Sequence, residues 1–190
     1  MRGRERVAFL RPHFVQCRPE LWRQLVMELG RAYNEEGDFP PSAAAEFNGW
    51  VVELELGSNN NVRYTSPFIN PEALRFYAER TGSVDGSHAK NAIEPTLEND
   101  FILRSNDLMR AGTLLSHEAV RPWLRRLAGF IVELRSDDGV FEHIYPAGVD
   151  VLTLSATFDP KDIDMLEQHY ALFAEIMQAL CLVSTAYTRD

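Results

Sequence analysis

The chain has 190 residues, of which 45% are hydrophobic and 25% are charged, a composition typical of one globular domain. Its formal net charge of -9 at pH 7 repels phosphate backbones and anionic lipid, so neither nucleic acid nor a membrane is an expected partner. No apolar run approaches the roughly 20 residues of a membrane span, so we expect a soluble cytoplasmic protein.

A basic arm is predicted over residues 1–18, followed by a single domain over residues 19–190. Over the first 23 residues only Glu5 and Glu20 oppose the arginines, which are Arg2, Arg4, Arg6, Arg11, Arg18 and Arg23. Such a charge run is typical of a solvated terminal arm that stays loose or folds back on an acidic body.

The domain is expected to begin with a helix near residues 19–29. Pro19 suits a first helical turn, and the apolar residues that follow recur on one helical face: Trp22, Leu25, Val26 and Leu29. Turn-forming residues are then dense up to residue 46, which predicts short edge strands or a loop.

The clearest strand pair is a hairpin around residues 57–61. Apolar residues alternate with Glu53 and Glu55 before a Gly-Ser-Asn-Asn-Asn turn and resume after it: Trp50, Val52, Leu54, Leu56, Val62, Tyr64 and Phe68. If Leu56 lies opposite Val62, Glu55 lies opposite Arg63 on the outer face. Glu53 and Glu55 could converge as a carboxylate pair, but charges on an open strand face ordinarily keep that face hydrated.

Further elements are predicted in chain order. They are a strand over 74–78, a long loop over 82–96, a strand over 101–104, a short helix capped by Ser105-Asn106-Asp107, a helix from the cap residue Ser116 to Leu127, and strands over 130–135, 140–145 and 149–158. The sequence Asp137-Asp138-Gly139 predicts a hairpin between the first two of these last three strands.

The C-terminal helix is the best-specified element. Asp159 is a candidate N-cap, Pro160 suits the first helical position, and Asp162 can complete a capping box. Two apolar rows follow, Ile163, Leu166, Tyr170, Phe173, Met177 and Leu180 in one, and Met165, Leu172, Ile176, Ala179 and Val183 in the other. Because this face is too wide for an exposed helix, we expect the helix to belong to the core.

The predicted fold class is therefore α+β, a curved antiparallel sheet packed against the C-terminal and N-terminal helices. A single sheet need not cover both apolar rows of the C-terminal helix. The second row, from Met165 to Val183, is therefore the expected interface of a homodimer.

The sequence contains no established catalytic, cofactor-binding or metal-binding pattern. The segment His117-Glu118-Ala119-Val120-Arg121 has arginine where a zinc-protease helix has its second histidine, and no disulfide framework or Cys/His zinc spacing involves Cys17 or Cys181. We therefore expect no catalytic residue, no cofactor and no metal. The one candidate for a ligand cavity, between sheet and helix, is the set Tyr64, His143, Thr153 and Ser155.

Several segments resemble a family of uncharacterised bacterial proteins, a domain of unknown function. The similar segments are Phe47-Asn48-Gly49-Trp50-Val51-Val52-Glu53, Val62 to Phe68 with Asn70-Pro71-Glu72, Leu74-Arg75-Phe76, Leu97 to Asp107, and Trp22 to Gly30, which is similar to the family's opening helix. Leu97-Glu98 and Arg104-Ser105 depart from that family's pattern. The resemblance implies no catalytic residue, and it implies structural roles for Arg63, Asn106 and Asp107.

The function expected from the sequence is a non-enzymatic interaction or ligand-binding domain whose partner is itself, as a homodimer, or another protein. A wide apolar helix face without a convergent acid, base and nucleophile favours this hypothesis. One alternative is a small-molecule carrier or enzyme that uses the cavity. Another is a dimer similar to secretion chaperones, which accepts an extended peptide on a sheet edge.

Overall fold

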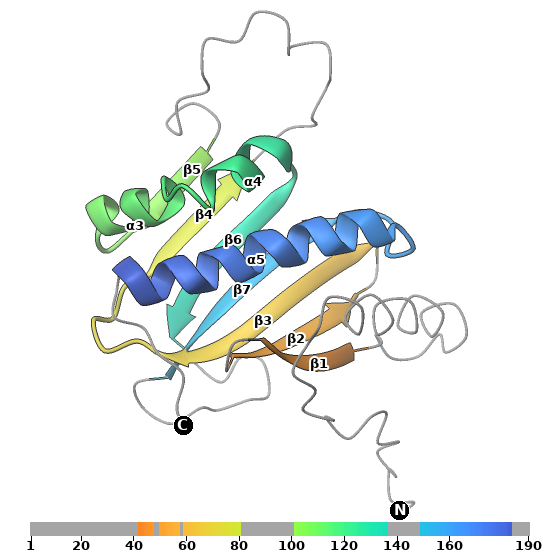
Figure 1. Ribbon diagram of the computed structural model, residues 1–190, viewed down its shortest axis with the longest axis horizontal. Coiled ribbons are helices and arrows are strands. Elements are labelled where there is room, and N and C mark those ends of the chain that lie inside the picture. The colour runs from red at the N-terminus through yellow and green to blue at the C-terminus, as the bar shows by residue number, and fades with distance from the viewer. Residues whose placement is uncertain (1–41, 48–49, 58, 81–100, 137–148, 184–190) are drawn as a thin grey trace, which may run out of the picture.

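The computed structural model describes residues 42–47, 50–57, 59–80, 101–136 and 149–183, with side chains from Val51 onward. These residues form an antiparallel sheet with helices packed on one of its faces (Figure 1), which confirms the α+β class. The predicted basic arm, the N-terminal helix, the 82–96 loop and the strand over 140–145 lie outside the described residues. Within the described ranges, no helix is both long enough and apolar enough to cross a membrane.

The sheet has seven strands in the order β1-β2-β3-β7-β6-β4-β5, and every neighbouring pair is antiparallel. The strands are β1 (Ser42–Phe47), β2 (Trp50–Leu56), β3 (Asn61–Ile69), β4 (Phe76–Arg80), β5 (Phe101–Ser105), β6 (Phe130–Ser136) and β7 (Val149–Thr157). The helices are α3 (Leu108–Leu115), α4 (Arg121–Arg126) and α5 (Ile163–Val183). Because the sheet is open, β1 and β5 are its two edges.

The predicted hairpin of β2 and β3 has the expected register. Leu56 lies opposite Val62, and Glu55 lies opposite Arg63 at 3.4 Å between the carboxylate and the guanidinium. Asn59 and Asn60 adopt positive φ angles of 59° and 60°, a conformation that asparagine tolerates better than most residues.

The hairpin predicted between residues 130–135 and 140–145 is not formed by β6, because both edges of β6 are already paired. Phe130 lies opposite Arg80 of β4 on one side and opposite Ala156 of β7 on the other. In the same way β7 separates β3 from β6, so the central strands of the sheet come from distant parts of the sequence.

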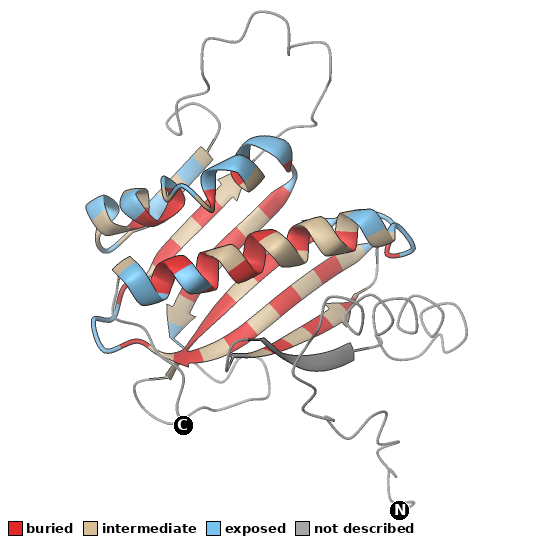
Figure 2. Cartoon of the chain, in the orientation of Figure 1, coloured by how far each residue is buried: buried red, intermediate tan, exposed pale blue. Residues whose placement is uncertain are grey.

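The two faces of the sheet differ in burial, as the alternating colours of the strands in Figure 2 show. The helix-covered face carries apolar side chains that are almost completely buried: Val52, Leu54, Leu56, Val62, Tyr64, Phe68, Phe76, Ala78, Phe130, Val132, Leu134, Leu152, Leu154 and Ala156. The opposite face, here called the open face, carries mostly half-buried polar and charged side chains. This alternation is the usual pattern of an antiparallel sheet with one face on the core.

Helix α5 crosses the centre of the covered face (Figure 1) and buries side chains from both predicted apolar rows, including Phe173 and Ile176. The helix begins at Ile163, three residues later than the predicted first position, Pro160. The carboxylate of Asp162 accepts a hydrogen bond from the Met165 backbone N–H at 3.0 Å, whereas Asp159 accepts one from the Lys161 N–H within the preceding turn. Asp162 therefore takes the capping role that was predicted for Asp159.

Helix α4 is shorter than predicted, because it begins at Arg121 and not after Ser116. Ser116 ends α3, where its backbone N–H bonds to the Gly112 carbonyl oxygen at 2.9 Å and the following N–H, of His117, bonds to the Leu114 carbonyl oxygen at 3.2 Å. Pro122 explains the late start, since a proline has no N–H to donate and is tolerated only in the first turn of a helix.

Candidate interaction surface

The residues predicted to line a ligand cavity lie on opposite faces of the sheet. Tyr64 is fully buried beneath α5 and donates a hydrogen bond from its hydroxyl to the Leu166 carbonyl oxygen at 2.8 Å; burial raises its pKa well above the ordinary value. Thr153 and Ser155 lie on the open face, opposite Thr65 and Arg63. The Thr153 hydroxyl lies 3.4 Å from the Glu133 carbonyl oxygen. The fourth residue, His143, lies outside the described residues.

Most of the residues predicted to form a dimer interface are buried in the core of their own chain. Leu172 and Ile176 have no exposed surface and Ala179 is 1% exposed, while Met165 and Val183, near the two ends of α5, are half-buried. Because the sheet is wide enough to cover both apolar rows of α5, Leu172, Ile176 and Ala179 offer no surface to a second copy. Of the predicted interface, only Met165 and Val183 keep part of their surface exposed.

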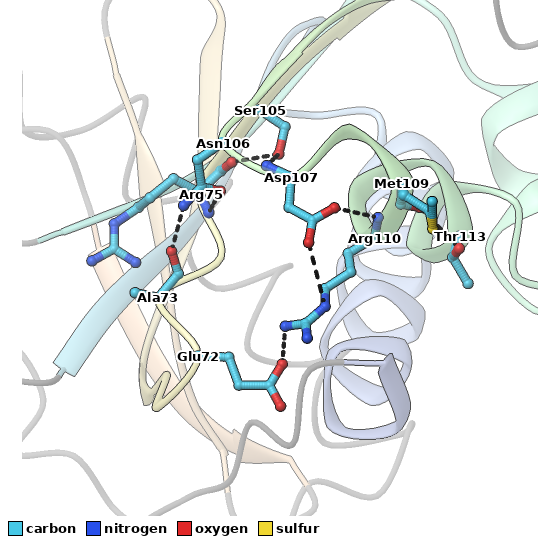
Figure 3. Close-up of polar contacts among 9 residues, drawn as sticks. All are labelled: Glu72, Ala73, Arg75, Ser105, Asn106, Asp107, Met109, Arg110 and Thr113. Atoms are coloured by element: carbon cyan, nitrogen blue, oxygen red, sulfur yellow. Dashed lines mark hydrogen bonds and ion pairs between the residues drawn. The ribbon is translucent and has the colours of Figure 1, made fainter.

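Two turns that are distant in sequence are joined by the network of polar contacts in Figure 3. The Asn106 side chain accepts from the Arg75 N–H and donates to the Ala73 carbonyl oxygen, both at 2.8 Å. Asp107 caps α3 by accepting from the Arg110 N–H at 3.1 Å, and the Arg110 guanidinium pairs with Glu72. This network fixes the end of the edge strand β5 and the start of α3 against the turn between β3 and β4.

A buried carboxylate lies at the start of β7, near the same turn. Asp150 is only 3% exposed, and it accepts hydrogen bonds from Asn70 Nδ2 at 2.5 Å and from the Arg75 guanidinium. Burial raises the pKa of Asp150, while these two donors act to lower it. These contacts join the start of β7 to the connection between β3 and β4, so the evident role of the cluster is structural.

His169 is buried in α5 among aromatic rings. Its ring stacks on Phe158 with 4.7 Å between centroids and meets Phe130 edge-on, and its Nδ1 lies 2.8 Å from the Met165 carbonyl oxygen. Its Nε2 is buried and has no hydrogen-bond partner among the residues that the structure describes. Burial lowers the pKa of His169, so the neutral ring is favoured in the folded chain.

The open face carries charged groups that largely neutralise one another. Glu55 pairs with Arg63 across β2 and β3, and Glu133 lies 4.0 Å from Arg135. The Tyr77 hydroxyl donates to Glu79 at 2.6 Å, and this hydrogen bond raises the pKa of Tyr77. None of the described helices covers this face, and its mixed charges suit contact with water.

The edge of the sheet at β5 is different, because exposed apolar side chains occur on the strand and at the start of the helix that follows it. Among the described residues, the large hydrophobic side chains with high exposure are Ile102 (45%), Leu108 (60%), Met109 (83%) and Leu182 (73%). Ile102 lies on β5, Leu108 and Met109 begin α3, and Leu182 lies near the end of α5, the helix against which α3 packs. We refer to β5 together with Leu108 and Met109 as the β5 edge.

Sequence reasoning did not identify the β5 edge. The segment Phe101-Ile102-Leu103-Arg104 predicted a strand correctly, but an apolar strand gives no sign of whether it lies in the centre or at an edge of a sheet. The one available signal was Met109, directly after Leu108 in the first turn of α3, since the buried apolar positions Ala111, Leu114 and Leu115 lie on the opposite side of the helix.

Comparison of the chain with protein-family models, with curated protein sequences and with solved structures gives no match. Within the part of the chain that the structure describes, no group of three or more His, Cys, Asp or Glu side chains is placed to hold a metal ion. The β5 edge is therefore the surface from which a function is inferred.

Proposed function

We propose that this chain is a non-enzymatic interaction domain that binds another polypeptide at the β5 edge. The observation that carries the proposal is the position of β5 at an edge of the described sheet, with exposed Ile102 on the strand and exposed Leu108 and Met109 at the start of the helix that follows. An unpaired sheet edge is a template for another strand, and exposed apolar side chains beside such an edge favour association. Two further expectations accompany this proposal. The expectation of no nucleic-acid or membrane partner rests on the net charge of -9, and that of a cytoplasmic location rests on the lack of a long apolar run in the sequence.

The binding mode is strand addition to the sheet. Among the described residues β5 pairs with β4 alone, so the backbone N–H and C=O groups along its other side are available to an extended segment. Ile102 and Arg104 point to the open face, and Phe101 and Leu103 point to the covered face. A suitable partner strand places apolar or acidic side chains beside Ile102 and Arg104, and apolar side chains beside Leu103.

The β5 edge also lacks most of the devices by which proteins prevent strand pairing. Natural edge strands are commonly protected by proline, by lysine or by a bulge. The segment Phe101–Ser105 contains neither proline nor lysine, and its register with β4 runs without interruption from Phe76 opposite Ser105 to Arg80 opposite Phe101. Arg104 is the only charged residue of the strand.

Two alternative functions, a peptide-binding dimer and a small-molecule carrier or enzyme, fit the structure unequally. A peptide-binding dimer similar to secretion chaperones would use the same edge-strand chemistry, so it is a special case of the proposal. A small-molecule carrier or enzyme is less favoured, because Tyr64 lies beneath α5 while Thr153 and Ser155 lie on the other face of the sheet.

Selection of peptides against the purified protein tests the proposal. A library of random extended heptapeptides is selected on the full chain, and the site of each selected peptide is mapped by amide hydrogen exchange. The proposal predicts that bound peptides slow exchange in residues 101–105 and that Ile102→Lys weakens their binding at least tenfold, while Thr157→Lys, at an exposed position of β7, does not. Peptides that protect other segments, or a library that yields no binder, would contradict it.

A further inference from the structure

We infer that the partner at the β5 edge is a second copy of this chain, and that the two β5 strands pair antiparallel about a two-fold axis at Leu103. This inference rests on the proposed function and adds the identity of the partner and the register of pairing. The two sheets would then join edge to edge into one continuous antiparallel sheet.

Symmetry restricts the register. In an antiparallel pair, residues directly opposite each other share a face of the sheet, so a two-fold axis must place one residue of β5 opposite itself. An axis at Leu103 pairs all of Phe101–Ser105 with its copy. An axis at Ile102 or at Arg104 pairs only three of these five residues, so Leu103 is the centre that uses the whole strand.

Charge favours the same centre. With the axis at Leu103, Arg104 lies opposite Ile102 of the second copy, so the arginine stem covers an apolar side chain that is 45% exposed in the single chain. With the axis at Arg104, two guanidinium groups lie directly opposite each other, which is unfavourable.

The register also supplies an acidic partner for Arg104. Glu79 of β4 lies opposite Ile102 in the existing pairing, so Glu79, Ile102 and Arg104 of the second copy form one row across three strands of the open face. Two strand spacings amount to about 10 Å, a span that extended arginine and glutamate side chains bridge together. The two-fold axis repeats this row, so Arg104 of the first copy likewise pairs with Glu79 of the second copy across the second copy's Ile102.

The covered face contributes apolar contact. Leu103, which is half-buried against the core, lies opposite its own copy, and Phe101 lies opposite Ser105. A two-fold axis perpendicular to the sheet places the helices of both copies on the same side. The exposed Leu108 and Met109, which follow β5 at this edge, then lie close to the junction between the two copies.

A charge-exchange experiment at Arg104 and Glu79 tests the inference. Sedimentation equilibrium from 1 to 100 µM is expected to show a dimer for the unaltered chain, and Arg104→Glu or Glu79→Arg alone is expected to raise the dissociation constant at least tenfold. The double variant Arg104→Glu/Glu79→Arg restores opposite charges in the row, so it is expected to recover most of the affinity. Thr157→Lys serves as the control, and thermal melting of each variant checks that the fold is retained.

The results of this experiment either support or overturn the proposed dimer. Recovery of affinity by the double variant supports the register centred on Leu103. A chain that remains monomeric at 100 µM, or a dimer that is indifferent to Arg104→Glu and Ile102→Lys, overturns the inference. Neither result refutes strand addition by a different partner, because the peptide selection described above decides the proposed function separately.

Discussion

The hydroxyl of Tyr64 donates a hydrogen bond to the backbone carbonyl oxygen of Leu166 at 2.8 Å and so joins the middle of β3 to the first turn of α5. The two residues are 102 positions apart, and both are fully buried. This contact fixes where α5 begins to cross the sheet, while Phe173 packs against the same tyrosine ring with 6.0 Å between centroids.

Removal of this hydroxyl is expected to lower stability modestly. Tyr64→Phe should reduce the free energy of unfolding by about 1 kcal/mol, because one buried hydrogen bond is lost while the Leu166 carbonyl keeps its bond within the helix. Urea unfolding measures the change. Tyr77→Phe is the control, since its hydroxyl lies on the open face; a loss equal to that of Tyr64→Phe would contradict the explanation.

The packing of α5 predicts a larger effect. Phe173 is fully buried at the centre of the helix, so Phe173→Ala is expected to cost about 3 to 5 kcal/mol through lost burial and the cavity that remains. Leu182, on the same helix but 73% exposed, provides the control, and Leu182→Ala should change the free energy of unfolding by no more than about 0.5 kcal/mol. Similar losses for both variants would mean that α5 does not pack as described.

The ion pair of Arg75 and Asp150 predicts a rescue. Arg75→Ala leaves a buried carboxylate with Asn70 as its remaining side-chain donor, so the free energy of unfolding should fall by about 3 kcal/mol or more. Adding Asp150→Asn removes the buried charge and should recover a large part of that loss. Chemical denaturation of the single and double variants provides the measurement, and simple addition of two losses would refute an electrostatic origin.

His169 predicts a dependence of stability on pH. Because burial lowers its pKa in the folded chain, the unfolded chain takes up a proton first as the pH falls through about 6.5, and stability declines below that pH. His169→Phe keeps an aromatic ring between Phe158 and Phe130 but does not titrate. The free energy of unfolding of the unaltered chain, minus that of the variant, should therefore be constant above about pH 7.5 and fall toward pH 5. Parallel pH curves would contradict this assignment.

Local patterns were sufficient to predict several elements. Alternating apolar residues and the Asn-rich turn gave the hairpin of β2 and β3 with its register, because both strands and the turn are contiguous in sequence. Helical periodicity gave α5, and the cap cluster Ser105-Asn106-Asp107, of which Asp107 is the N-cap, gave the start of α3. Each of these features depends on residues within a short stretch of chain.

Other features depended on long-range pairing, which periodicity does not encode. The insertion of β7 between β3 and β6 brings Asp150 to Asn70 and Arg75, and it buries a carboxylate that the sequence alone presents as an ordinary acidic residue. The same pairing leaves β5 at an edge and exposes Ile102. The candidate site was missed because its position in the sheet, and not its residue types, makes it available for binding.

Amide hydrogen exchange of residues 101–105 at low and high protein concentration tests the central claim most directly. If the β5 edge pairs with a second copy, exchange in these residues slows between about 1 and 100 µM protein, a range in which standard protein interfaces associate, while exchange in the interior strand β7 stays constant. Exchange at β5 that is rapid and identical at both concentrations would contradict self-association at this edge.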